Sequence, residues 1–330
     1  MPNRTSIRTI AEHMNVAAST VSRALAADPG VSEEKRQEIL NVARQLNYRP
    51  KPMRRKRTRN IGVIIRSSRS GFRSHEFMQG VIYQFERSAS ERGEHLHVSF
   101  LDDELDADPV PALVKEGRLD GVILAGYPSR TSCDAIADYG IPVVVLHDSY
   151  ERTGLPCVKL DSSSGYREAF MQLLDTGRKR VAFAVSGHNP EMRDVMTQAL
   201  IDAGGAVEPG LILTDLPDSF MGGKQATHHF LDIKNRPEAL VFSNDWMALG
   251  CMFTLNKLGI EVPKEISVLG HDNIKIGWEL DTPLTTIDSS LNGSSKAALE
   301  MLTRAMNKQS VQKEREVRAQ LFLRSTWIPI

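Results

Sequence analysis

From residue 61 onward, short apolar runs alternate with segments of helical periodicity, and this alternation constrains the fold more than any other feature. The runs are expected strands at 61–65, 95–101, 121–124, 142–146, 180–185, 211–214, 239–242 and 266–269. Expected helices lie between them, as at 75–92, 164–176, 192–203, 220–233 and 245–258. Strands without polar alternation are typical of parallel sheets buried on both faces. Two doubly wound α/β subdomains of about 130 residues each suit this length better than one very large sheet.

The first 50 residues predict a separate all-α unit of three short helices. Apolar residues at helical spacing give each helix one core face. They are Ile7, Ile10, Ala11, Met14, Val21, Ala24, Leu25, Ile39, Val42, Ala43 and Leu46. The second helix leaves Ala18, Ser19, Ser22 and Arg23 on its outer side. Such a face fits the DNA major groove, roughly 12 Å wide, so the pattern predicts a helix-turn-helix unit. A plain three-helix unit with a solvated basic face is the alternative.

The net charge of the chain is zero, but its two parts differ strongly. Residues 1–60 hold 13 Lys and Arg against five Asp and Glu, a net charge of +8. Residues 61–330 hold 28 against 36, a net charge of −8. A basic segment attached to an acidic body is typical of a protein that binds a polyanion. Double-stranded DNA is therefore the expected partner.

The side chains of the second helix suit different parts of a DNA duplex. Arg23 can donate two hydrogen bonds to guanine, Ser19 can bond several bases, and Ala18 can lie against a thymine methyl group. Short hydroxyl side chains suit phosphate oxygens, which fix the register without reading the sequence. The hydroxyls expected to contact phosphates are those of Ser6, Thr20 and Ser22.

Composition and motifs argue against several other classes. The N-terminus lacks the apolar core of a secretory signal, and no apolar run approaches the roughly 18 residues of a membrane span. Cys133, Cys157 and Cys251 are scattered without metal-binding spacing, so no metal or cofactor is expected and the cytoplasm is the expected location. No nucleophile elbow, phosphate loop or HExxH motif is present. A non-enzymatic solute receptor and a sugar-processing enzyme are the alternatives for the α/β body.

Specific runs in the first 50 residues carry a family resemblance. They are Ile10-Ala11, Val16, Thr20-Val21-Ser22-Arg23-Ala24-Leu25, Val31-Ser32 and Asn47-Tyr48-Arg49-Pro50. Residues 6–50 resemble the headpiece of the LacI/GalR family of transcription regulators. The body resembles the periplasmic-binding-protein-like effector domain of that family through runs at 120–124, 140–144, 177–183, 244–250, 266–273 and 282–287. The resemblance implies a regulator, most often a repressor, in which Ala18, Ser19 and Arg23 touch base edges.

The resemblance also implies how the chain is divided. A helix-turn-helix headpiece takes residues 1–50, a basic hinge 51–60, and an effector-binding and dimerisation domain 61–330. Within that domain, one subdomain takes about 61–160 and 289–316, and the other about 161–288 and 317–330. A ligand cleft is expected between them at the carboxyl ends of the strands, where open α/β sheets bind ligands.

The linker 51–60 departs from the family pattern because it is short, very basic and free of leucine. In the family, a hinge leucine wedges into the minor groove at the centre of the operator. Met53 is the apolar side chain that could replace this leucine, and Arg54 and Arg55 follow it. A disordered basic tether is an equal alternative, and either form adds salt-sensitive affinity for DNA.

Polar residues after two expected strands are the main candidates for effector binding. Asn244 and Asp272 match family positions that hydrogen-bond effector hydroxyls, and such groups suit a carbohydrate. Helix capping by Asn244 and a turn role for Asp272 are the alternatives. Arg193 and Asp148 match family ligand positions with a shift of one residue. The aromatic residues expected to face a ligand ring are Trp246, Phe77 and Tyr127.

These expectations combine into one mechanism. A homodimer reads the two half-sites of an approximately palindromic operator, and closure of the cleft on a small metabolite changes the spacing of the headpieces. A last strand and a short end are expected over 322–330, which leaves no leucine heptad for a tetramer.

Overall fold

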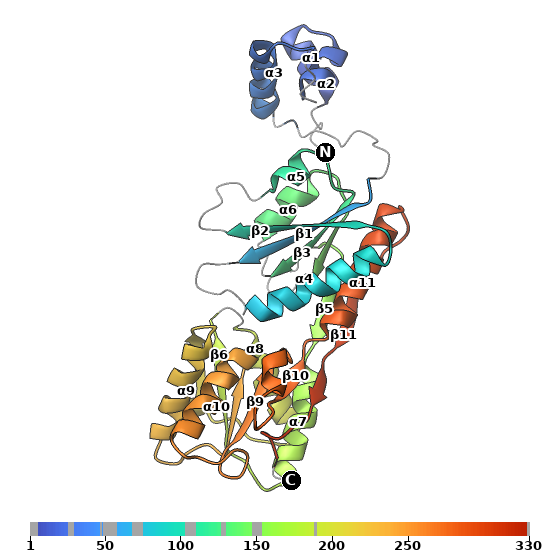
Figure 1. Cartoon of the computed structure of the whole chain (residues 1–330). Helices are drawn as coiled ribbons and strands as arrows, with labels where there is room; N and C mark the ends of the chain where they lie inside the picture. Colours follow the sequence, from blue (N-terminus) through green and yellow to red (C-terminus); the bar gives the residue numbers. More distant parts are fainter. Residues whose placement is uncertain are drawn as a thin grey trace.

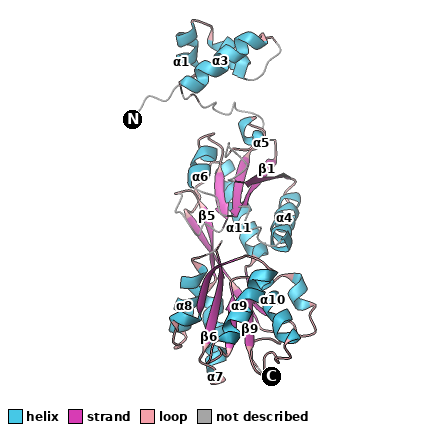
Figure 2. Cartoon of the chain, turned by 90° about the vertical axis from the view of Figure 1, so that its left-hand side faces the viewer, coloured by secondary structure: helices cyan, strands magenta, loops and turns pink. Residues whose placement is uncertain are grey.

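The computed structural model describes residues 6–25, 30–46, 48, 58–67, 75–102, 110–126, 130–146, 154–187 and 190–328. A three-helix unit precedes two α/β subdomains that are joined end to end (Figures 1 and 2). Within the described residues, each subdomain has one six-stranded sheet with helices on both faces. The predicted fold class is therefore confirmed.

The N-terminal unit contains α1 (Ile7–Met14), α2 (Ala18–Leu25) and α3 (Glu33–Gln45). Each helix contributes two residues to the buried core, which are Ile10, Ala11, Val21, Ala24, Ile39 and Ala43. Asn15 ends α1 in the left-handed conformation with φ 50°, which an asparagine tolerates better than most residues. The chain therefore turns sharply between α1 and α2.

The first subdomain contains a parallel sheet with the order β11-β5-β4-β3-β1-β2. Its strands are β1 (Asn60–Ser67), β2 (His95–Asp102), β3 (Gly121–Gly126), β4 (Val143–Leu146), β5 (Cys157–Asp161) and β11 (Glu314–Arg318). One face packs against α4 (His75–Ser90) and α11 (Leu291–Met306). The other face packs against α5 (Ala112–Lys115) and α6 (Arg130–Ala137).

The second subdomain contains a sheet with the order β12-β10-β9-β8-β6-β7, in which the edge strand β12 is antiparallel to β10. Its strands are β6 (Val181–Ser186), β7 (Ile212–Leu216), β8 (Ala239–Phe242), β9 (Ser267–His271), β10 (Thr285–Asp288) and β12 (Gln320–Phe322). The helices α7 (Ser163–Asp175) and α8 (Met192–Asp202) cover one face. The helices α9 (Phe220–Asp232) and α10 (Asp245–Lys257) cover the other. Two short 3-10 helices are η1 (Pro209–Leu211) and η2 (Lys275–Trp278).

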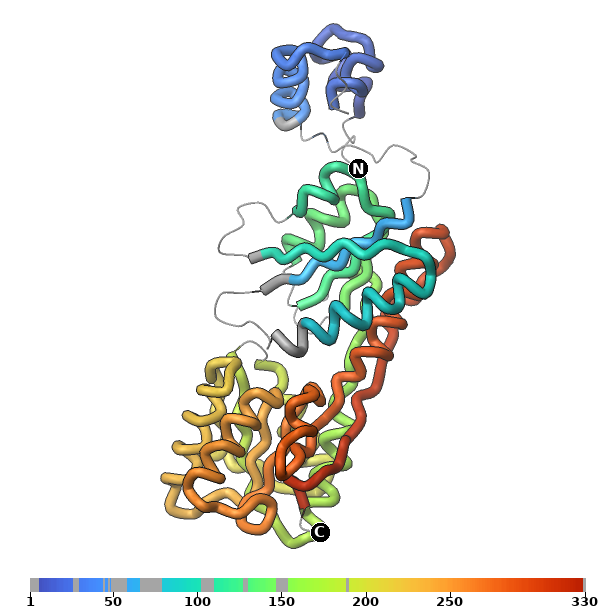
Figure 3. The backbone as a smooth tube through the Cα atoms, viewed as in Figure 1, coloured from blue at the N-terminus to red at the C-terminus, as the bar shows by residue number. Residues whose placement is uncertain are grey.

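Within the described residues, the chain crosses between the subdomains at Ser162, Ser289 and Ala319 (Figure 3). Ser162 follows β5 and Ser289 follows β10, so the carboxyl ends of these two strands lie at the boundary. Because the neighbouring strands are parallel to them, each sheet turns its carboxyl edge towards the other subdomain. Open α/β sheets bind their ligands at this edge.

Three observed strands were not expected, because the sequence shows no apolar run at any of them. The strand β11 reads Glu-Arg-Glu-Val-Arg and lies at a sheet edge with alternating exposure, where charges are common. Its neighbour β5 ends in Lys-Leu-Asp. The strand β10 contains Thr285 and Thr286, whose buried hydroxyl groups are hydrogen-bonded within the protein.

The last strand, expected with a short end over 322–330, lies earlier in the chain, because β12 spans Gln320–Phe322. Trp327 is completely buried, and its indole Nε1 donates a hydrogen bond to the carbonyl oxygen of Ala169 at 2.8 Å. The end of the chain therefore fills the core beside α7 instead of lengthening the edge strand.

Candidate functional site

The helix α2 has one buried face and one exposed polar face. Val21 and Ala24 are at most 1% exposed, and their burial fixes the rotation of the helix within the unit. Ala18, Ser19 and Arg23 are exposed on the outer side. The structure therefore brings the three predicted base-contacting residues together on a surface that is open to a partner.

The three hydroxyls predicted to contact phosphates differ in their surroundings. Thr20 and Ser22 are half-buried on α2, whereas Ser6 is exposed. The Ser6 Oγ atom accepts a hydrogen bond from the Thr9 backbone N–H at 3.2 Å, and the Thr9 Oγ1 atom accepts one from the Ser6 N–H at 3.3 Å. Ser6 therefore begins α1 with a capping box, a structural role that the sequence pattern did not assign to it.

Several predicted site residues lie outside the part of the chain that the structure describes. They are Met53, Arg54, Arg55, Tyr127, Asp148 and the side chain of Phe77. Their roles stay predictions.

Asn244 begins α10 at the carboxyl end of β8. Its Oδ1 atom accepts a hydrogen bond from the Met247 backbone N–H at 2.9 Å, and its Nδ2 atom donates to the Asp218 carboxylate. The capping role considered for Asn244 is therefore present, and it fixes the orientation of the amide. Asp218 was not among the predicted site residues, although it closely follows β7, another strand of this sheet.

Asp272 follows β9, the strand next to β8. Its backbone has φ 107°, and the next residue, Asn273, has φ 56°. Two successive residues other than glycine in this region are unusual, and such strain concentrates at functional sites. The Asp272 Oδ1 atom accepts a hydrogen bond from the Ser289 hydroxyl at 2.8 Å. This carboxylate is therefore tied to a crossover between the subdomains.

Asp245, the residue after Asn244, is almost completely buried and was not predicted as a site residue. Its carboxylate accepts hydrogen bonds from the Thr286 hydroxyl at 2.7 Å and from the Ile274 backbone N–H at 2.9 Å. A Cβ atom at Gly270 would overlap this carboxylate, so β9 needs a glycine there. Burial raises the pKa of Asp245 well above its usual range, while the hydrogen bond from Thr286 acts in the opposite direction.

A fourth carboxyl group, that of Asp288, and the guanidinium of Arg324 lie near Asp245. Burial raises the pKa of Asp288, and the backbone hydrogen bond from Ser290 opposes the change. The Arg324 guanidinium donates hydrogen bonds to the Leu284 carbonyl oxygen and to Asn273 Oδ1, both at 2.6 Å. Burial lowers the pKa of Arg324, and the nearby Asp245 and Asp288 oppose this change.

Two other predicted effector residues, Arg193 and Trp246, have different surroundings. Arg193 is exposed in the first turn of α8, and its Nε atom pairs with the neighbouring Asp194 carboxylate at 2.9 Å. Trp246 lines a surface pocket of about 670 Å³ along α10, together with Leu249 and Phe253. The structure therefore places Asn244 and Asp272 after neighbouring strands of the second sheet, whereas Arg193 lies on α8 and Trp246 lines the pocket along α10.

The described residues contain no group of three or more His, Cys, Asp or Glu side chains placed to hold a metal ion. None of the described helices is long and apolar enough to cross a membrane. The side chains of Cys133, Cys157 and Cys251 are buried, and none of the three forms a disulfide bond.

Two family models match this chain. The model of bacterial regulatory proteins of the lacI family matches residues 6–51, and the model of the periplasmic binding protein-like domain matches residues 170–327. The first model covers the helix-turn-helix unit, and the second covers most of the second subdomain together with α11 and β11 of the first.

Named relatives match nearly the whole chain. Catabolite control protein A of Priestia megaterium is 25% identical over 325 residues, which cover 93% of this chain and 94% of the relative. The HTH-type transcriptional repressor CytR of Escherichia coli (strain K12) is 27% identical over 328 residues, which cover 93% and 91%.

Solved structures have the same fold over the full length. The complex of the transcriptional regulator CelR with cellobiose has a TM-score of 0.71 at 20% identity, and the match covers 98% of this chain and 100% of that one. The lac repressor dimer bound to operator and the anti-inducer ONPF has a TM-score of 0.68 at 20% identity, with coverage of 99% and 100%. The chain therefore combines a helix-turn-helix domain of the lacI family with a periplasmic-binding-protein-like domain, and it is similar over nearly its whole length to named transcription regulators.

Proposed function

We propose that this regulator is a repressor whose affinity for its operator is controlled by a neutral carbohydrate bound between the two subdomains. The observation that carries the proposal is the position of Asp272. Asp272 follows a strand at the edge that faces the first subdomain, and its backbone is strained. Its carboxylate accepts a hydrogen bond from the crossover residue Ser289. A ligand that bonds to Asp272 would therefore act directly on the connection between the subdomains.

The chemistry of this edge favours a ligand rich in hydroxyl groups. Asp272 and Asp218 offer carboxylate oxygens, which accept hydrogen bonds from hydroxyl groups. The structures of similar fold include a complex with cellobiose and one with bound ribose. We assign effector contacts to Asp272 and Asn244, with Arg193, Asp148, Trp246, Phe77 and Tyr127 as further candidates.

For the DNA side, we assign base contacts to Ala18, Ser19 and Arg23 and phosphate contacts to Ser6, Thr20 and Ser22. Residues 1–50 form the reading unit, and 51–60 form a basic hinge with Met53, Arg54 and Arg55. A homodimer would place two reading units on a palindromic operator, and the lac repressor of similar fold is a dimer on its operator. A protein with this partner acts in the cytoplasm.

The proposal includes no enzymatic activity. The relatives described above are named as a control protein and a repressor. Turnover of a sugar by the purified chain without any preference for a duplex would favour the enzyme instead.

Selection of duplexes from a random pool by the full-length protein tests the proposal. We expect enrichment of an approximate palindrome, and a change in operator affinity when a binding neutral sugar is added. The variant Asp272→Asn should keep its operator affinity without sugar and lose the response to sugar. Failure to enrich any duplex would contradict the proposal.

A further inference from the structure

The hydroxyl group of Tyr166 is a buried polar group that the family assignment leaves unexplained. Tyr166 lies in the first turn of α7, shortly after the crossover at Ser162, and is 0% exposed. Its Oη atom is buried, and no group in the described part of the chain makes a hydrogen bond with it. Buried polar side-chain atoms are nearly always paired, so an unpaired hydroxyl calls for an explanation.

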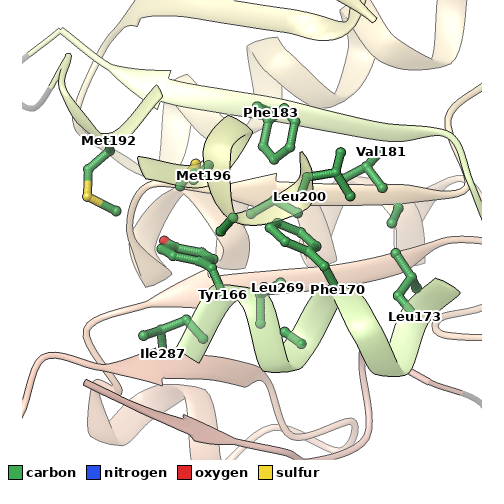
Figure 4. Close-up of a cluster of buried hydrophobic side chains, with 14 of the residues drawn as sticks. Tyr166, Phe170, Leu173, Val181, Phe183, Met192, Met196, Leu200, Leu269 and Ile287 are labelled. Atoms are coloured by element: carbon green, nitrogen blue, oxygen red, sulfur yellow. The ribbon is translucent and has the colours of Figure 1, made fainter. Parts of the chain in front are cut away.

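The hydroxyl is directed towards the edge of the sheet that holds Asp272. The Tyr166 ring stacks on Phe170 with centroids 6.1 Å apart, and it lies 5.7 Å from the ring of His271. Figure 4 shows the hydroxyl oxygen pointing away from Phe170, at the end of the cluster where Met192 lies. Met192 begins α8, the helix that follows β6, so this end is the carboxyl edge of the second sheet.

Residues of two crossover segments lie close to this position. The His271 Nε2 atom lies 3.4 Å from the Ser162 hydroxyl, and Asp272 accepts the hydrogen bond from Ser289. Tyr166 is therefore next to the residues that join β9 to two of the three crossovers. A group that binds here would contact the edge through which both subdomains are connected.

The charges around the hydroxyl define what it can bind. Burial raises the pKa of Tyr166 well above its usual range, and the carboxylates of Asp272 and Asp245 raise it further. The hydroxyl therefore stays protonated and can donate a hydrogen bond. Because the Asp272 carboxylate lies near the hydroxyl, an anion placed between these two groups is disfavoured.

Resting on the proposed function, we propose that Tyr166 is a specificity-determining residue of the effector site. Its hydroxyl donates a hydrogen bond to one oxygen of a neutral, polyhydroxylated ligand, and a neighbouring ligand hydroxyl donates to Asp272. Adjacent oxygens of a neutral sugar meet both requirements. The charge of a sugar acid or a sugar phosphate opposes binding at this end of the site.

The first test measures the stability of Tyr166→Phe in the full-length chain without sugar. We expect the midpoint of thermal unfolding to be unchanged or higher, because the lost hydroxyl makes no hydrogen bond to the protein. A midpoint several degrees lower would show that the hydroxyl has a structural partner, such as a fixed water molecule, and would overturn the proposal.

The second test measures sugar binding by titration calorimetry. The probes are D-ribose, D-glucose and cellobiose, with D-glucuronate and D-glucose 6-phosphate as anionic counterparts. We expect the wild type to bind a neutral probe, and Tyr166→Phe to weaken this binding about 3- to 10-fold, as one net hydrogen bond requires. The control Tyr139→Phe removes the same group from a half-buried tyrosine in the first subdomain and should leave the dissociation constant unchanged.

An equal dissociation constant in wild type and Tyr166→Phe would overturn the proposal. Binding of the anionic probes alone, or of no probe, would also overturn it. Operator affinity without sugar is measured on the same samples. If the protein binds its operator but the sugar results contradict the proposal, only this inference fails. If the protein binds no operator, the proposed regulator function fails.

Discussion

Asp245 and Asp272 follow neighbouring strands and are fixed in different ways. The Asp245 carboxylate accepts its hydrogen bonds inside the second subdomain, from the Thr286 hydroxyl and the Ile274 backbone N–H. Asp272 is bonded to a crossover residue instead. The sequence identified Asp272 as a candidate because it follows an expected strand and matches a family position that hydrogen-bonds effector hydroxyls. It did not identify Asp245, because its burial depends on contacts with residues far along the chain.

Replacement of Asp245 by asparagine tests the cost of burying this carboxyl group. Because burial raises the folded-state pKa above 3.8, the folded chain holds a proton there that the unfolded chain releases. Wild-type stability should therefore fall as the pH rises from about 4 towards the raised pKa, and stay at the lower level above it. Asparagine does not ionise, so Asp245→Asn should gain stability relative to wild type over this interval.

Urea unfolding at several pH values between about 4 and 8 measures this difference. Parallel pH profiles of the two proteins would show that the carboxyl group is not shifted. The variant Asp232→Asn is a suitable control, because Asp232 is exposed at the end of α9.

Replacement of Arg23 by alanine tests base reading by α2. We expect a loss of about 1–3 kcal/mol in binding free energy, concentrated at one base position of the operator. Arg8→Ala removes the same charge from an exposed position on α1, so it controls for the loss of charge alone. Binding of a set of single-base operator variants measures the effect, and a uniform loss across them would make Arg23 a phosphate contact.

At the scale of elements, α9 and α10 approach each other through backbone atoms. A Cβ atom at Gly223 would overlap the carbonyl oxygen of Met247, and one at Gly250 would overlap that of Phe220. This close packing fixes the start of α10, where Asn244 and Asp245 lie. Apolar periodicity predicted both helices. The short distance between them depends on two glycines, and the backbone atoms that lie against these glycines come into contact only when the chain folds.

Gly223→Ala should therefore destabilise the protein by about 1–3 kcal/mol, as typical overpacking does. The control is Gly210→Ala, because a Cβ atom at Gly210 meets nothing within 4 Å. Denaturant unfolding gives both free energies. Equal stability of the two variants would mean that the helices can separate without cost.

At the scale of the whole molecule, the described chain connects the two subdomains through crossovers at Ser162, Ser289 and Ala319. Asp272 and His271 contact two of these crossovers through Ser289 and Ser162. A ligand at the carboxyl edge of the second sheet would therefore alter the position of the first subdomain. The basic segment 51–60 connects the first subdomain to the reading unit.

The effector and the operator should change each other's affinity by the same factor, as thermodynamic linkage requires. Operator titrations with and without sugar give one factor, and sugar titrations with and without operator give the other. Equal operator affinities for every sugar that binds would contradict the coupling. Asp272→Asn should bring both factors close to one.

The hinge prediction concerns the shape of the bound DNA. If Met53 wedges into the minor groove, the wild type should bend its operator and Met53→Ala should bend it less. Met53→Leu is the matched control, because it keeps an apolar side chain of similar size. Bend angles from gel mobility of permuted fragments measure the effect, and straight DNA with wild type would reject the wedge.

Most of the helices and strands and the polar face of α2 followed from the sequence alone, because periodicity is a local property, whereas the polar strands β5, β10 and β11 did not. Asn244 and Asp272 became candidates because they follow expected strands and also match positions of the family that the sequence resembles. The tertiary structure decided which polar groups are buried and paired. Thr286 lies 41 residues from Asp245, and His271 lies 109 residues from Ser162. Burial and hydrogen bonding across such separations depend on the packed sheet, and so the unpaired hydroxyl of Tyr166 has no counterpart in any sequence pattern.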